Sequence, residues 1–201
     1  MIAHASHATT PDRRREILDA ALACFSEQGV AGTTIADLRH KSKASTGSIY
    51  HHFGDKDGVA AGVYLEILRR YQASALEVLD MAGTAEALVK GIVRHFLDWV
   101  MANRAAARFL VEMRHAETVL MSDKSIRLET RRAVERINAE LDRYVGEGAL
   151  RLVPSELYAA IIFGPCHAAA EQWLRSGARG ELTAVKEPLA EAAWCSLAPP
   201  R

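Results

Sequence analysis

The chain has 201 residues, of which 49% are hydrophobic, 25% are charged and 6% are aromatic. This composition supports a sizeable core, excludes a disordered chain and favours helix over sheet. A formal net charge of zero excludes a generally basic nucleic-acid coat protein, but it is compatible with a local DNA-binding face such as Arg39–Lys43, which carries bases and no acid.

Residues 1–9 are expected to form a flexible tail, and they lack the apolar segment of a signal peptide. The three cysteines are far apart and show neither zinc spacing nor a disulfide framework. No run of about 18 apolar residues predicts a membrane span. We therefore expect a cytoplasmic protein that has no metal site, no cofactor and no contact with a membrane.

The next residues predict a compact helical unit over 10–54. Thr10 can cap a first helix that Gly29 ends. Thr34 and Asp37 form a capping-box pattern at the start of a second helix, and Ser45 can cap a third that runs through Phe53. Three helices in so few residues, two of them short, indicate a helix-turn-helix DNA-binding domain.

Asp55 can cap a long connecting helix over 55–79, which opens the second predicted domain, 55–201. Gly58 and Gly62 lie inside this helix, where each costs roughly 1 kcal/mol relative to alanine. Either close packing of helices or a compliant hinge would explain these two glycines. Further helical patterns cover 85–102, 105–117, 123–147, 155–176 and 181–197. The predicted fold is all-α, with a three-helix head and a six-helix body.

Residues 17–59 carry an ordered set of features. They are the helix ILDAALACF, Gly29, Thr33–Thr34, Asp37–Leu38, the run Ser-Thr-Gly-Ser-Ile-Tyr, His52–Phe53, and Lys56 before Val59. In these features the segment closely resembles the tetracycline-repressor (TetR) family. The resemblance implies an all-α homodimer that regulates transcription, with a recognition helix at 45–52. Lys43 departs from the family's frequent glycine, so the turn must tolerate a side chain where a left-handed backbone is expected.

The chemistry of the recognition helix agrees with this role. Gly47 would let the backbone approach the major groove closely, and the Tyr50 phenol suits a phosphate oxygen. The resemblance implies phosphate contacts for Thr34, Tyr50, His52 and Lys56, and base contacts for Thr46, Gly47, Ser48 and His51. The full set of candidate DNA-binding residues is Thr34, Ser45, Thr46, Gly47, Ser48, Tyr50, His51, His52 and Lys56.

Structural explanations compete with some of these roles. Tyr50 could be a core aromatic, and Thr34 could be only a helix cap. Arg13–Arg15 could be a solvated face rather than a phosphate contact. His51 and His52 could suggest a metal, but adjacent helical residues point about 100° apart and hold one ion poorly.

The two C-terminal helical segments, 155–176 and 181–197, are rich in apolar and small residues. The TetR resemblance implies that they pair with the same helices of a second copy as a four-helix bundle. A homodimer also fits a palindromic double-stranded DNA operator.

A small-molecule effector site is expected in the body, among aromatic and polar residues. For each residue, an ordinary place in the core or on the surface is the alternative. Glu112 would suit a cationic effector, and Arg114 or His115 an acidic one. The candidate ligand-binding residues are Phe96, Trp99, Phe109, Glu112, Met113, Phe163, Cys166, His167 and Trp173.

The sequence thus predicts a ligand-responsive repressor, a homodimer that a small-molecule inducer releases from its operator. An activator of the same fold is the first alternative. A small all-α enzyme is the second, but the sequence has no HExxH motif, phosphate-binding loop or nucleophile elbow. We therefore expect that the protein is not an enzyme.

Overall fold

A computed structural model describes residues 10–113, 124–180 and 182–199 of the chain. The predicted tail, residues 1–9, and the candidates Arg114 and His115 lie outside the described residues. The described ranges contain nine helices and no strand, so the all-α prediction is confirmed. None of these helices is both long and apolar enough to cross a membrane.

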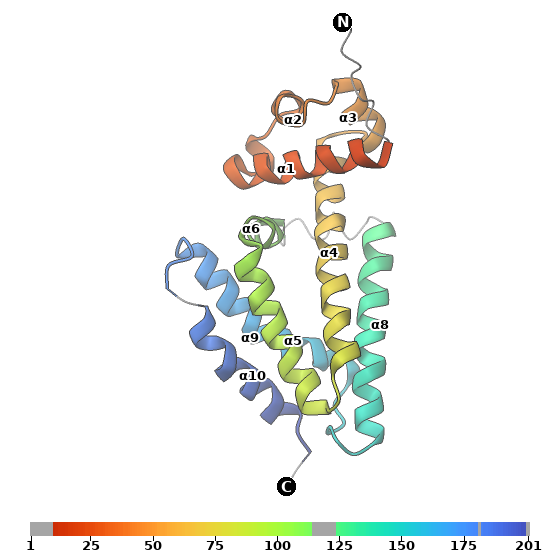
Figure 1. The fold of residues 1–201 in the computed structure, drawn as a ribbon, viewed down its shortest axis with the longest axis vertical. Helices are drawn as coiled ribbons and strands as arrows, with labels where there is room; N and C mark the ends of the chain where they lie inside the picture. Colours follow the sequence, from red (N-terminus) through yellow and green to blue (C-terminus); the bar gives the residue numbers. More distant parts are fainter. Residues whose placement is uncertain (1–9, 114–123, 181, 200–201) are drawn as a thin grey trace, which may run out of the picture.

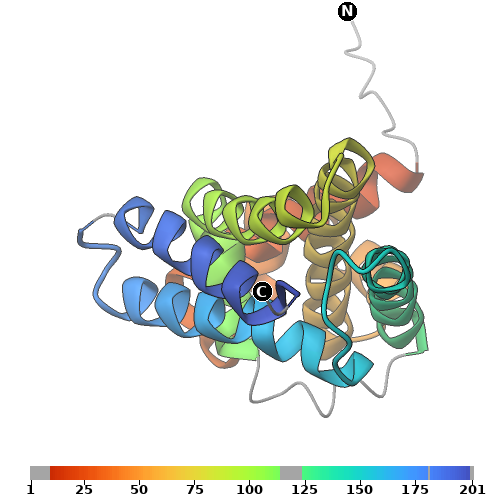
Figure 2. The same ribbon diagram turned by 90° about the horizontal axis from the view of Figure 1, so that it is seen from below.

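Three helices form the upper end of the molecule in Figure 1: α1 (Thr10–Gly32), α2 (Ile35–Ser42) and α3 (Thr46–Phe53). The long helix α4 (Lys56–Met81) descends from them into the lower part. The remaining helices surround its lower half or lie beside it: α5 (Ala85–Ala102), α6 (Arg104–Met113), α8 (Lys124–Gly146), α9 (Ser155–Arg175) and α10 (Thr183–Leu197). Figures 1 and 2 show α9 and α10 side by side on one flank.

Side-chain caps fix where the short helices begin, as the sequence predicts. The Thr34 hydroxyl accepts from the Asp37 backbone amide at 3.2 Å, and the Asp37 carboxylate accepts from the Thr34 amide at 2.8 Å. Ser45 accepts from the Ser48 amide at 3.1 Å. These bonds satisfy amides that a helix start leaves without partners, which matters most for helices of only eight residues.

Two of the residues with positive φ lie on either side of α2. Gly29 has φ +73° and interrupts the regular helix of α1 near its end, as the sequence suggests. Lys43 follows α2 with φ +56°, so the turn before α3 does hold a side chain in the left-handed region. The angle between α2 and α3 therefore depends on a residue that departs from the glycine common in the TetR family.

The glycines of α4 lie where helices meet closely. A Cβ atom at Gly58 would overlap the carbonyl oxygen of Phe53, the last residue of α3. A Cβ at Gly62 would meet the Phe53 ring at 3.0 Å and Leu18 at 3.1 Å. These distances favour close packing over a hinge, and they join the end of α3 firmly to the start of α4.

The buried side chains form two clusters. One combines α1–α3 with the first half of α4, and it includes the fully buried Leu38 and Ile49. It also takes in Phe109 and Met113 of α6. The other fills the space between the lower half of α4 and helices α5, α8, α9 and α10. Helix α6 thus contributes to the core of the upper part although it lies below it (Figure 1).

Candidate functional site

Helix α3 presents a polar outer face and an apolar inner one. Ile49 is fully buried, whereas Thr46, Gly47 and His51 are exposed. Tyr50 is 49% exposed, which rules out the alternative that it is a core aromatic. Of the other candidates on or before this helix, Ser45 is exposed, and Ser48 and His52 are half-buried. The face can therefore offer hydroxyls, a phenol and imidazoles to a partner.

Gly47 differs from the glycines of α4 because nothing inside the protein requires it. A Cβ atom there would find only the Ser45 Oγ, at 4.0 Å. Glycine inside a helix nevertheless costs about 0.5–1 kcal/mol relative to alanine. The open space above Gly47 lies outside the chain, where an approaching partner would benefit from the missing side chain.

Thr34 and Lys56 are both engaged within the protein. The Thr34 hydroxyl donates to Asp37 Oδ2 at 2.7 Å in addition to capping α2, although the residue remains exposed. The Lys56 ammonium donates to the carbonyl oxygens of Ala31 at 3.2 Å and Thr33 at 3.0 Å. Lys56 therefore links the end of α1 to the start of α4, and its third N–H is left for an external acceptor.

The electrostatics of this face are local. Burial lowers the pKa of His52, and electrostatic repulsion involving His51 and Arg14 lowers it further, so His52 is neutral near pH 7. A neutral imidazole can donate or accept a hydrogen bond. Lys41 is paired with Glu27, while Arg39 and Lys43 are exposed at the end of α2.

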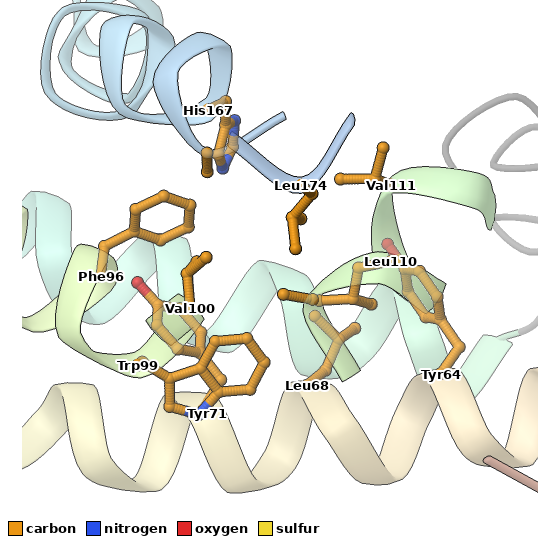
Figure 3. A pocket seen from close by; sticks show the side chains of 12 residues that line it. Tyr64, Leu68, Tyr71, Phe96, Trp99, Val100, Leu110, Val111, His167 and Leu174 are labelled. Carbon is orange, nitrogen blue, oxygen red and sulfur yellow. The ribbon is translucent and has the colours of Figure 1, made fainter. Parts of the chain in front are cut away.

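A cavity of about 220 Å³ lies in the lower part of the molecule, bounded by α4, α5, α6 and α9 (Figure 3). Most of its walls are aromatic or aliphatic. It is lined by Tyr64, Leu68, Tyr71, Phe96, Trp99, Val100, Ala107, Leu110, Val111, His167, Ala170 and Leu174.

A second cavity of about 160 Å³ lies among α4, α5, α8 and α9. Leu68 and Tyr71 line both cavities and so form a common wall. The other residues that line the second cavity are Gln72, Ala75, Leu76, Leu79, Ile92, Thr130, Ala133, Val134, Ile137 and Phe163.

Residues 17–63 match the family model described as "Bacterial regulatory proteins, tetR family". This match covers most of α1, all of α2 and α3, and the first turns of α4. The chain belongs to the TetR family. It is a transcriptional regulator with a DNA-binding helix-turn-helix.

Relatives extend the TetR likeness along the chain. The HTH-type transcriptional regulator BetI of Burkholderia mallei is 29% identical over 182 residues, 88% of each chain. The HTH-type transcriptional repressor AcnR of Corynebacterium glutamicum is 37% identical over 75 residues, 37% of this chain and 38% of AcnR. FadR of Bacillus subtilis, solved in complex with stearoyl-CoA, has the same fold, with a TM-score of 0.80 at 16% identity over 89% of this chain and 96% of that one.

The structure separates the ligand-site candidates of this TetR regulator into groups. Phe96, Trp99 and His167 line the larger cavity, and Phe163 lines the smaller one. The others line neither cavity. Phe109 and Met113 are buried in the upper core, Cys166 and Trp173 are buried in the lower core, and Glu112 is exposed.

Helix α4 contributes cavity residues that the sequence reasoning missed, above all Tyr71. The Tyr71 ring meets Trp99 edge-on at 5.2 Å between centroids and stacks on His95 at 5.7 Å. Tyr64, Leu68 and Tyr71 recur at helical spacing on one face of α4. That periodicity could have identified the face, but not that it borders a void.

Burial shifts the pKa values of two titratable groups beside the larger cavity. Burial raises the pKa of the Tyr71 phenol well above its ordinary value, and Cys166 adds a smaller effect in the same direction. Burial also lowers the pKa of His95, against the opposing influence of Asp98 and Glu77. His95 Nε2 lies 3.1 Å from the Ser74 hydroxyl. Both groups are therefore uncharged near pH 7.

Proposed function

We propose that this TetR regulator is a homodimeric repressor that binds a palindromic operator through α3 and is released when a small molecule occupies the cavities beside α4. The observation that carries the proposal is the outer face of α3, where exposed polar side chains flank an otherwise unexplained Gly47. In this proposal, residues 10–54 bind DNA, and residues 55–201 bind the effector and the second copy.

Contacts with DNA divide into two kinds. Tyr50, with its phenol exposed, and Lys56, with its remaining N–H, position the head on phosphates. Thr46 and His51 lie on the exposed side of α3, where they reach base edges once the backbone at Gly47 is close to the groove. AcnR, which is 37% identical over 75 residues, is named a repressor, and this favours repression over activation.

The dimer is supported by the outer flank of α9 and α10. Exposed small or apolar residues recur there at helical spacing on α9, with Gly164 and Ala168 exposed and Leu157 46% exposed. Val185 is 38% exposed on α10, with Ala192 exposed further along. Such a flank lets helices of a second copy approach closely, and a two-fold dimer matches two half-sites about 34–36 Å apart.

The effector response is supported by the two helices that touch both the cavity and the head. Helix α4 lines both cavities with Leu68 and Tyr71, and its start is held against α3 by the close contact at Gly58. Helix α6 lines the larger cavity with Leu110 and Val111, while Phe109 is buried in the upper core. A molecule that prefers the arrangement with separated heads lowers DNA affinity by its differential affinity for the two states.

The test of DNA binding uses fluorescence anisotropy with duplexes from the region upstream of the protein's own gene. We expect saturable, salt-dependent binding by two subunits per site, and Thr46→Ala or His51→Ala should change base preference at one or two positions in each half-site. Binding that shows no preference for any duplex would contradict operator recognition. In vitro transcription then separates repression from activation.

The test of the dimer is sedimentation at micromolar concentration. Ala168→Arg places a charge on the exposed flank of α9 and should yield monomers. Ala73→Arg places the same charge at an exposed position of α4 and serves as the control. A wild-type monomer, with or without DNA, would refute the dimer.

A further inference from the structure

The Tyr71 hydroxyl is a polar group enclosed by apolar walls. Its oxygen is buried and has no hydrogen-bond partner among the residues that the structure describes. In Figure 3 the oxygen lies on the Phe96 side of the larger cavity. Leaving a buried hydroxyl without a partner costs folding free energy, so native proteins seldom do so unless a ligand or water completes the bond.

Tyr71 also occupies the boundary between the two cavities, together with Leu68. These two side chains separate the cavities, so a molecule that displaces them would reach the buried hydroxyl and extend from the larger cavity into the smaller one. Taken together, the cavities reach the lower end of the range for ligand pockets, roughly 300–1,000 Å³. This arrangement suits an elongated molecule rather than a compact one.

The walls argue against a charged ligand. Among the described residues, neither cavity is lined by an aspartate, glutamate, lysine or arginine. A cation moved from water into such a site would lose its hydration without gaining an opposite charge, and an anion would find only the His167 imidazole as a counter-charge. Because burial raises the pKa of Tyr71, its hydroxyl keeps its proton near pH 7 and is available as a donor.

We infer that the effector cavity of the proposed function binds a neutral, elongated, mostly apolar molecule whose single carbonyl oxygen accepts a hydrogen bond from the Tyr71 hydroxyl. The apolar chain of this molecule extends past Leu68 into the second cavity, between α4 and α8. The aromatic rings of Phe96 and Trp99 cover the carbonyl end. Tyr71 is thus the residue that determines specificity at the site.

The first experiment measures binding to the full chain by calorimetry in the absence of DNA. The probes are 2-undecanone, decanoate and nonyltrimethylammonium, which share chain length but differ in charge. We expect the ketone to bind at least tenfold more tightly than either ion. Equal or tighter binding of the anion or of the cation would overturn the inference, and the cation outcome would indicate recognition by the aromatic faces instead.

The second experiment removes only the hydroxyl. Tyr71→Phe should weaken binding of 2-undecanone roughly three- to tenfold, the effect of one hydrogen bond. Its melting temperature without ligand should stay the same or rise, because an unpartnered buried hydroxyl is removed. Tyr158→Phe is the matched control, since the buried Tyr158 lines neither cavity. Unchanged ketone affinity in Tyr71→Phe, or an equal loss in Tyr158→Phe, would refute the role of Tyr71.

The third experiment tests the extension into the second cavity with 2-ketones of increasing length. Affinity should rise about three- to fourfold for each added methylene until the space is filled. Ala75→Leu and Ala133→Leu narrow the second cavity alone and should end this rise at a shorter chain. If neither variant changes the length dependence, the extension is wrong.

Operator release is measured separately by anisotropy. If 2-undecanone binds in a Tyr71-dependent way but leaves operator affinity unchanged, the proposed coupling fails while the assigned ligand chemistry stands.

Discussion

Phe25 of α1 stacks on Phe109 of α6, with ring centroids 5.7 Å apart and planes inclined by 16°. Phe25 belongs to the helix against which α2 packs, while Leu110 and Val111, next to Phe109 in sequence, line the larger cavity. Stacked aromatic pairs contribute roughly 0.5–1.5 kcal/mol beyond the area that they bury. This contact provides a direct mechanical connection between the cavity wall and the DNA-binding helices.

Phe109→Leu should weaken this connection while keeping the site apolar. We expect the free energy of unfolding to fall by about 1–3 kcal/mol, since the loss of the stacked pair adds to imperfect filling of the core. Hydrogen exchange should accelerate in α1 and α2 but not in α9 and α10. Ile162→Val, a similarly small change in the lower core, is the control. Uniform loss of protection in both variants would contradict a specific role for the Phe25–Phe109 contact.

Two glycine-to-alanine substitutions should have opposite effects. Gly47→Ala places a methyl group in open space and should leave stability unchanged or raise it by up to about 1 kcal/mol. It should also weaken operator binding at least tenfold, because the backbone can no longer approach the groove. Gly58→Ala forces a methyl group against the Phe53 carbonyl and should lower the melting temperature markedly. Thermal unfolding and anisotropy together test both; normal DNA affinity in Gly47→Ala would contradict the proposed interface.

Lys56→Ala should have two effects that can be separated. Loss of the bonds to Ala31 and Thr33 should lower the free energy of unfolding by about 1–2 kcal/mol. Loss of the phosphate contact should reduce the slope of log affinity against log salt by about one unit per subunit. Lys43→Ala, at the exposed end of α2, provides the comparison for a general charge effect. A lower stability with an unaltered salt slope would show that Lys56 has only a structural role.

Acidification should destabilise the protein through the half-buried His95. Unfolded imidazoles titrate near 6.5, whereas burial holds the pKa of His95 below that value in the folded state. The unfolded state therefore binds more protons in this range, and the free energy of unfolding should fall as pH decreases from about 7.5 through 6.5. His95→Gln should flatten this dependence, measured by denaturant unfolding at a series of pH values. Parallel profiles for the variant and the wild type would contradict this explanation.

Local chemistry explains which parts of the fold were predictable from the sequence. Thr34, Ser45 and Asp55 each cap the helix that follows them, as predicted, because capping depends on residues only three apart. The helix predicted at 85–102 has the bounds observed for α5, and the others described in full agree to within a few residues.

The cavity was less predictable, because its walls depend on contacts between distant segments. Cys166 and Trp173 have the composition of a ligand site, yet neighbours from other helices fill the space around them and leave them in the core. In the sequence, Tyr71 belongs only to the periodic pattern of a packed helix. Its unpartnered hydroxyl becomes evident when α5 and α9 are in place around it. Periodicity identifies a buried face but carries no measure of the volume left empty beside it.

The tight contact between Phe53 and Gly58 holds the recognition helix α3 against α4, so that the two helices move together as one rigid arm. At 26 residues, α4 is about 39 Å long, so a tilt of about 5° at its lower end would carry its tip through about 3 Å. In a two-fold dimer both arms tilt, and the tips separate by about twice that distance, a considerable misfit against half-sites 34–36 Å apart. Under the proposed function, leverage of this kind would let a ligand that displaces the cavity walls by only a fraction of an ångström release the protein from DNA.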